Sequence, residues 1–164
     1  MTTPFFLLIQ FSILAYALVA GVFLAFSDFI MRALANTSGV GGEEAMQIIN
    51  KEVFRWIFMT LFLGMAAVSI LIAVLAWINV GGTAGLLIVL AALVYLIGCF
   101  GVTVIFNVPM NEALAGMDLS SDTTHAYWIE TYVPRWTFWN GVRTGAATLS
   151  AAILLFGLTW MNPH

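Results

Sequence analysis

The chain has 164 residues, of which 62% are hydrophobic and 8% are charged, with a formal net charge of −3 and a mean hydropathy of +1.03. Soluble domains carry about 25% charged residues, so the composition excludes an ordinary soluble domain, and the net charge gives no sign of nucleic-acid binding. All Lys, Arg, Asp and Glu residues lie in two windows, 28–55 and 112–143, and the other stretches are uncharged. The sequence therefore predicts an integral membrane protein whose main partner is the lipid bilayer.

Four apolar stretches are long enough to cross the bilayer as helices, since one crossing takes ~20 apolar residues. We predict an all-α, four-transmembrane-helix bundle that forms one domain over residues 1–164, with helices at about 5–34, 53–78, 84–106 and 134–160. No basic residue precedes Arg32, so we expect the first stretch to remain as a span and not to act as a cleavable signal peptide. A tight turn is expected at 79–82, and longer loops at 35–52, with an amphipathic segment at 45–50, and at 107–133.

The basic residues predict the orientation of the protein. They lie at the side of the two longer loops, and they are Arg32, Lys51, Arg55, Arg135 and Arg143. Lys and Arg are enriched on the cytoplasmic side of membrane proteins. We therefore expect the two longer loops in the cytoplasm and both termini outside.

A shift of the sequence by 80 residues aligns 53–58 with 133–138 and suggests an internal repeat, with copies at about 1–80 and 81–160. Two parallel helical hairpins related by a pseudo-twofold axis along the membrane normal would produce this pattern. Biased apolar composition is the alternative explanation. Arg143 stands where the first copy has Leu63, so polar residues that break the repeat are candidates for a functional site.

Helix four carries a polar face, because Trp136, Asn140, Arg143 and Ala147 recur at helical spacing. Arg143 lies ~9 Å along the axis from the start of the apolar stretch, where a guanidinium is costly unless it has a partner. Asp28 is the only acidic residue inside a predicted span. An Asp28–Arg143 pair would lock helices one and four together, and the same residues could also form a functional site.

Asn107 and Asn111 flank Pro109 at the end of helix three. Pro109 suits the first turn of a new helix, so this segment could serve only to start that helix. Alternatively, the two amides point at a ligand held beneath the following loop.

An acidic and histidine-containing segment and a pair of glycines each have both a structural and a functional interpretation. Asp122 and His125 could bind a metal, but a lone histidine among acids is more often a solvated loop residue, so no metal site is predicted. Gly141 and Gly145 form a small-residue step on another face of helix four, which would serve the bundle or a homo-oligomer.

Four segments together resemble the anthrone-oxygenase-like family of small four-span membrane proteins, of which most bacterial members are known only as a domain of unknown function. They are 26–34 (FSDFIMRAL), 45–50 (AMQIIN), 98–114 (GCFGVTVIFNVPMNEAL) and 136–144 (WTFWNGVRT). The resemblance implies oxidation of an anthrone to an anthraquinone with dioxygen, and location in the bacterial inner membrane. The family usually has His at the position of Gly141.

The resemblance and the polar residues together predict an oxygenase that acts on a flat phenolic or anthrone-like compound, with dioxygen as co-substrate and no cofactor evident from the sequence. The expected catalytic residues are Asp28, as the base, with Asn140 and Arg143, and the expected substrate-binding residues are Asn107, Asn111, Trp136 and Trp139. The arginine and the amides would hold oxygen substituents, and a tryptophan would stack on the ring. The alternative is a non-catalytic membrane module that binds a lipid, a quinone or a partner protein.

Overall fold

The computed structural model describes residues 2–55 and 57–160, which form four long helices and one short helix. The first long helix joins α1 (Thr3–Ala25), the π-helical turn η1 (Phe26–Ile30) and α2 (Met31–Ala35), and the second is α4 (Ile57–Asn79). The third joins α5 (Gly82–Tyr95), the π-helical turns η2 (Leu96–Gly101) and η3 (Thr103–Asn107), and α6 (Val108–Ala115). The fourth joins α7 (Asp122–Tyr127), the π-helical turn η4 (Trp128–Tyr132) and α8 (Val133–Thr159). The short helix is α3 (Gly41–Glu52).

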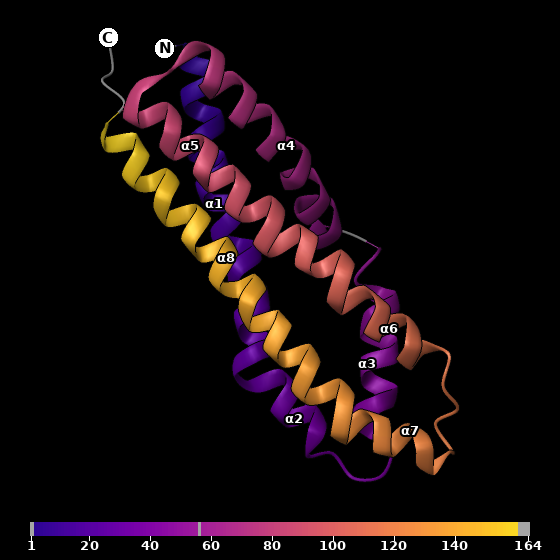
Figure 1. Ribbon diagram of the computed structural model, residues 1–164. Helices are drawn as coiled ribbons and strands as arrows, with labels where there is room; N and C mark the ends of the chain where they lie inside the picture. Colours follow the sequence, from indigo (N-terminus) through magenta and orange to yellow (C-terminus); the bar gives the residue numbers. More distant parts are fainter. Residues whose placement is uncertain (1, 56, 161–164) are drawn as a thin grey trace.

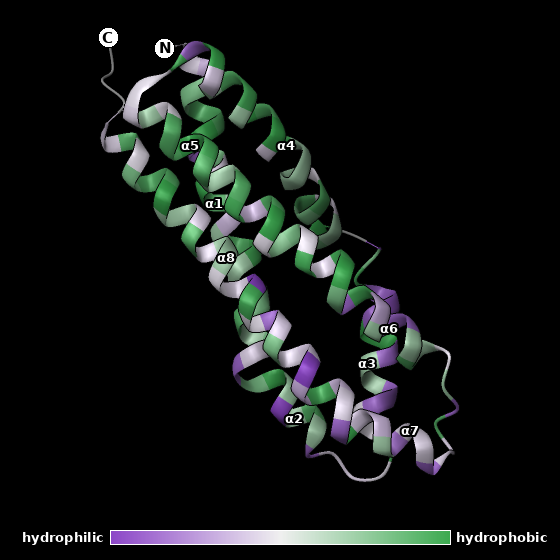
Figure 2. Cartoon of the chain, in the orientation of Figure 1, coloured by the Kyte–Doolittle hydropathy of each residue, from purple (hydrophilic) through white to green (hydrophobic). Residues whose placement is uncertain are grey.

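The four long helices, Thr3–Ala35, Ile57–Asn79, Gly82–Ala115 and Asp122–Thr159, are each long and apolar enough to cross a membrane, which confirms the predicted all-α architecture with four candidate spans. Both termini lie at one end of the bundle, and α2, α3, α6 and α7 lie at the other (Figure 1). Three of the helices have 33, 34 and 38 residues. At ~1.5 Å per residue they exceed the ~30 Å hydrocarbon layer, so they extend beyond it. Hydrophilic residues gather at the end formed by α2, α3, α6 and α7 (Figure 2).

The predicted loop at 107–133 is mostly helical, which corrects the expectation from the sequence. Pro109 occupies the first turn of α6, where its missing N–H costs nothing, and α6 ends at Ala115. Ser121 then caps α7, because its Oγ accepts a hydrogen bond from the backbone N–H of Thr123 at 3.3 Å. Only 116–121 therefore connect the third and fourth long helices.

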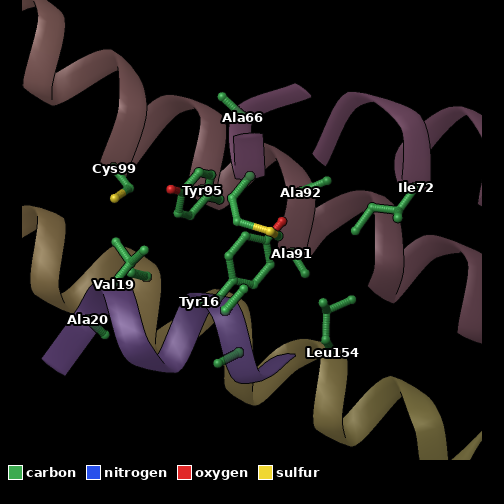
Figure 3. Packing of buried hydrophobic residues seen from close by; sticks show 14 of the residues in the cluster. Tyr16, Val19, Ala20, Ala66, Ile72, Ala91, Ala92, Tyr95, Cys99 and Leu154 are labelled. Carbon is green, nitrogen blue, oxygen red and sulfur yellow. The ribbon is translucent and has the colours of Figure 1, made fainter. Parts of the chain in front are cut away.

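The long helices pack around a core in the apolar half of the bundle, with α1 and α5 each against α4 and α8. Tyr16 and Tyr95 stack with ring centroids 4.6 Å apart. Figure 3 shows both side chains among the buried residues of the core. Their hydroxyls are satisfied inside the protein: Tyr16 Oη lies 2.6 Å from Ser69 Oγ, and Tyr95 donates to the Phe62 carbonyl at 3.0 Å. Buried hydroxyls with partners are compatible with an apolar surrounding.

The ends of the helices follow the 80-residue offset found in the sequence. The first and third long helices end at Ala35 and Ala115, and the second and fourth end at Asn79 and Thr159. The two halves also differ. Residues 53–55 form a turn between α3 and α4, whereas η4 continues directly into α8, and the third long helix has two π-helical turns where the first has one. The rotation that would relate the halves stays a prediction.

Candidate functional site

A partly open cavity of about 90 Å³ lies beneath α3 at the polar end of the bundle. Its aromatic lining residues are Phe23, Phe26, Phe54, Phe58, Phe62 and Trp136, and its polar lining residues are Asn50, Thr103, Asn111 and Arg143. The remaining lining residues are aliphatic or methionine. Ligand pockets commonly combine apolar walls of this kind with a few oriented polar groups.

Arg143 is the charged group of the cavity, although its side chain is only 4% exposed. One terminal nitrogen donates to Thr103 Oγ1 at 3.4 Å and the other to Asn140 Oδ1. The guanidinium carbon lies 4.2 Å from the ring centroid of Phe23 and 5.1 Å from that of Trp136, so two aromatic faces cover the cation. All these partners are neutral, and among the described residues Arg143 Nε has no hydrogen-bond acceptor.

Asn140 holds Arg143 in place and ties α8 to the first long helix. Its amide nitrogen donates to the Phe23 carbonyl and to Ser27 Oγ, each at 2.6 Å, while its oxygen accepts from Arg143. Asn140 is completely buried and does not line the cavity. It therefore positions the guanidinium and leaves ligand contact to other residues.

Asn111 lines the cavity, and its hydrogen bonds define the orientation of its amide. Its Oδ1 accepts hydrogen bonds from Trp136 Nε1 and from the Tyr132 hydroxyl, both at 2.8 Å. Because the indole N–H can only donate, the amide oxygen must face Trp136, and the amide nitrogen faces elsewhere. Asn50 Nδ2 donates to Tyr132 Oη at 3.3 Å, which connects this network to α3.

The structure does not form the expected Asp28–Arg143 pair. Asp28 is exposed on η1 and lies 3.5 Å from Arg32 one turn along the same helix, so its charge is compensated there. The wide turn η1 changes the angular position of Asp28 on the helix relative to a regular α-helix. Asp28 is not among the residues that line the cavity, and the prediction that it converges with Arg143 was wrong.

The two other expected substrate-binding residues lie outside the cavity. Asn107 is fully buried between η3 and α8, where its amide donates to the Trp136 carbonyl at 3.2 Å. Trp139 stacks on Phe106, with centroids 3.6 Å apart, in a groove on another face of α8. The structure thus brings together Arg143, Asn111 and Trp136 at one cavity and Asn140 behind them. The catalytic and binding roles of all these residues stay predictions.

Gly141, where the family usually has His, lies on a different face of α8 from Arg143. It borders a surface groove with Met31 and Arg32, and a Cβ added there would meet nothing within 4 Å. A histidine at this position would point away from the cavity. The same open surrounding holds for Gly145, so association of copies through this glycine face stays a prediction.

Asp122 and His125 lie on α7, and neither residue lines the cavity. His125 Nδ1 is 2.8 Å from Glu43 Oε1, and this pair joins α7 to α3, which forms the roof of the cavity. The role of His125 in the fold is therefore a contact between two helices.

Sequence reasoning missed Asn50, Thr103 and Phe23 as neighbours of Arg143. One indication for Asn50 was present in the sequence, the amphipathic segment at 45–50, because the apolar face of such a segment packs against the rest of the protein. Thr103 and Phe23 lie in apolar stretches without any local mark, so only the packing of the helices reveals them.

The comparison with known proteins agrees with this architecture. A family model described as "Anthrone oxygenase" matches residues 51–153, which is more than half of the chain. No curated protein and no solved structure shows significant similarity to the chain. The matched region contains Asn111, Trp136, Asn140 and Arg143. The chain belongs to the anthrone oxygenase family.

Proposed function

We propose that this protein is a membrane-embedded oxygenase that oxidises a flat phenolic or anthrone-like compound with dioxygen. The observation that carries the proposal is the aromatic cavity with one buried, uncompensated guanidinium. Family membership supports the reaction class.

The walls of the cavity suit a planar aromatic ligand. Phe58 and Phe62 are stacked with ring planes 13° apart, and Phe23 packs edge-on against both. Trp136 forms part of the opposite side, together with Phe26, whose centroid lies 5.7 Å from it. Aromatic side chains bury large apolar areas and favour stacked or edge-on contact with a planar ring system.

The opening of the cavity is apolar, which favours entry from the bilayer. Val22 and Phe54 line the cavity and are 39% and 65% exposed. A hydrophobic substrate that gathers at the membrane interface could reach the cavity between α1 and the turn before α4.

The polar lining residues support this reaction because they include hydrogen-bond donors for an oxygen atom of the substrate. An anthrone that loses a carbon-bound proton becomes an enolate, which reacts with dioxygen at that carbon, and loss of water then gives the quinone. In sum, a CH₂ group and dioxygen become a carbonyl group and water. Arg143 and the Asn111 amide can donate hydrogen bonds to the enolate oxygen, and preorganised donors of this kind stabilise the charge that develops in a transition state.

Dioxygen uptake by the purified protein in nanodiscs supplied with 1,8-dihydroxyanthrone tests the proposal. We expect uptake above that of empty nanodiscs and formation of the dihydroxyanthraquinone. Arg143→Leu should lower the rate by roughly 10²- to 10³-fold, as removal of an oxyanion donor does. Arg135→Leu is the matched control, because Arg135 lies in the groove beside Trp139, outside the cavity.

A non-catalytic module that binds a quinone or a lipid is the second candidate. It is favoured by one observation, because no acidic residue and no histidine is found among the described residues that line the cavity. Binding of the anthraquinone without any dioxygen uptake above the empty nanodiscs would establish this alternative.

A further inference from the structure

We propose that the cavity takes its substrate as the anion, an enolate or phenolate, and that the protein supplies a counter-charge for it and no general base. The inference rests on the proposed function only for the nature of the substrate, a flat acidic phenol or anthrone. The substrate proton goes to water at the membrane interface as the anion enters the cavity.

The first argument is charge balance. Within the described part of the chain, Arg143 is buried without a carboxylate partner, and its contacts to Thr103, Asn140 and two aromatic rings leave its charge uncompensated. A buried charge without a counter-ion is unfavourable in a medium of low polarity. A bound anion would supply the missing charge, whereas a neutral phenol would not.

The second argument is the direction of the hydrogen-bonding groups. Asn111 must turn its oxygen toward Trp136 and Tyr132, so its amide hydrogens are the part available to a ligand. Arg143 lines the same cavity, and its guanidinium can only donate hydrogen bonds. Two donors on one cavity favour a ligand oxygen that only accepts, as the oxygen of an enolate or phenolate does.

The third argument concerns the titratable groups on the surrounding helices, which are all engaged elsewhere or lie outside the cavity. Asp28 of η1 is exposed beside Arg32, and Glu52 of α3 pairs with Arg55 at 3.2 Å. Tyr132 of η4 donates to Asn111.

The further titratable groups on these elements also lie outside the cavity. Glu43 of α3 pairs with His125, and Glu44 of α3 and Glu130 of η4 are exposed. Cys99 of η2 is buried in the bundle core, while Lys51 of α3 and Glu112 of α6 are exposed. No titratable group except Arg143 is found among the described lining residues, so none is placed to take a proton from a bound ligand.

The test measures the ionisation of bound 1,8-dihydroxyanthrone, whose anion has its own visible absorption band. The compound is titrated with pH under anaerobic conditions in phosphatidylcholine nanodiscs, with and without the protein. We expect the protein to lower the pH of half-ionisation by at least one unit, which corresponds to about a 10-fold preference for the anion. Arg143→Leu should abolish this shift, Arg143→Lys should retain part of it, and Arg135→Leu should leave it unchanged.

Asn111→Asp provides a second variant that keeps the fold. One carboxylate oxygen can still accept from Trp136 and Tyr132, while the other places a negative charge in the cavity that holds Arg143. We expect this variant to bind the anion at least 10-fold more weakly than the original protein, at unchanged thermal stability or above it.

Two results would overturn the inference. One is an unchanged pH of half-ionisation in the presence of the original protein. The other is a rate of dioxygen uptake that rises at the same pH for a series of anthrones of different acidity, and that is lost in the variants Asp28→Asn or Tyr132→Phe. A base of the protein would then set the pH dependence of the rate. If instead the anion binds with the expected shift but no dioxygen is consumed, the oxygenase proposal fails and the anion site remains.

Discussion

At the scale of single residues, the polar groups of this protein differ in how much of the fold depends on them. Asn140 makes hydrogen bonds that join α8 to the first long helix, whereas Asp28 makes one exposed ion pair within its own helix. Both residues looked equally important in the sequence, because each is a polar residue inside an apolar stretch. The two residues differ in the burial of their side chains and in their hydrogen-bond partners.

Replacing Asn140 by Ala should lower the free energy of unfolding by about 1 to 3 kcal/mol, because it leaves the Phe23 carbonyl and the Arg143 guanidinium without their partner. Asp28→Asn should change it by about 0 to 1 kcal/mol, the usual range for an exposed pair. Thermal unfolding in detergent, followed by tryptophan fluorescence, measures both. A larger loss in Asp28→Asn than in Asn140→Ala would contradict the assignment.

At the scale of elements, two kinds of contact hold the cavity walls. The long helices approach each other closely where small residues meet, as at Gly98 of η2 and Ala146 of α8. The short helix α3, in contrast, is held by side chains that reach the end of α6: Gln47 donates to the Leu114 carbonyl at 2.8 Å and to the Met117 carbonyl at 3.3 Å. The roof is therefore less tightly packed than the walls.

Gly98→Ala should lower the free energy of unfolding by about 1 to 3 kcal/mol, because the added Cβ would lie 2.7 Å from Ala146 Cβ and force η2 and α8 apart. Gly64→Ala in α4 is the matched control, since its Cβ would meet nothing within 4 Å. That substitution should stabilise by about 0.5 to 1 kcal/mol through better helix propensity. Equal effects of the two in thermal unfolding would argue against close packing at Gly98.

Gln47→Ala should loosen the roof without unfolding the bundle. The two carbonyls at the end of α6 lose their donor, and a net loss of about 1 kcal/mol would speed hydrogen exchange of α3 about 5-fold. Exchange in α5 should stay unchanged. Gln10→Ala on the exposed surface of α1 serves as control, and faster exchange in all helices would show instead that Gln47 supports the whole fold.

At the scale of the whole molecule, the distribution of charge predicts how the bundle sits in a bilayer. The outer surface of the long helices is apolar, while the basic residues lie in the two windows at the end that carries α2, α3, α6 and α7 (Figure 2). The orientation with this end in the cytoplasm follows from the bias of Lys and Arg. It stays a prediction, as does the pseudo-twofold repeat.

Single cysteines in a Cys99→Ser background test the orientation. Ser38→Cys and Ser120→Cys should be protected from an impermeant maleimide in intact cells and should react after lysis, and Thr83→Cys should react in both cases. All three side chains are exposed. A cysteine at Gly42, in the same loop region as Ser38, would be unsuitable for labelling, because its Cβ would collide with the Leu34 carbonyl oxygen. The reverse pattern of labelling would place the termini in the cytoplasm.

The sequence by itself determined the four spans, the polar end and the polar face of the fourth helix. These features depend on local properties: hydrophobicity over ~20 residues defines a span, and the 3.6-residue period puts Trp136, Asn140 and Arg143 on one face. The family resemblance, too, follows from contiguous motifs.

Only the tertiary structure decided which partners these residues meet. The rotation of each helix, changed further by wide π-helical turns, places Asp28 and Trp139 outside the cavity and Asn111 inside it. The orientation of the Asn111 amide depends on Trp136, which lies 25 residues away along the chain. Contacts between distant segments are set by the packing of all four helices together, and no local pattern encodes them.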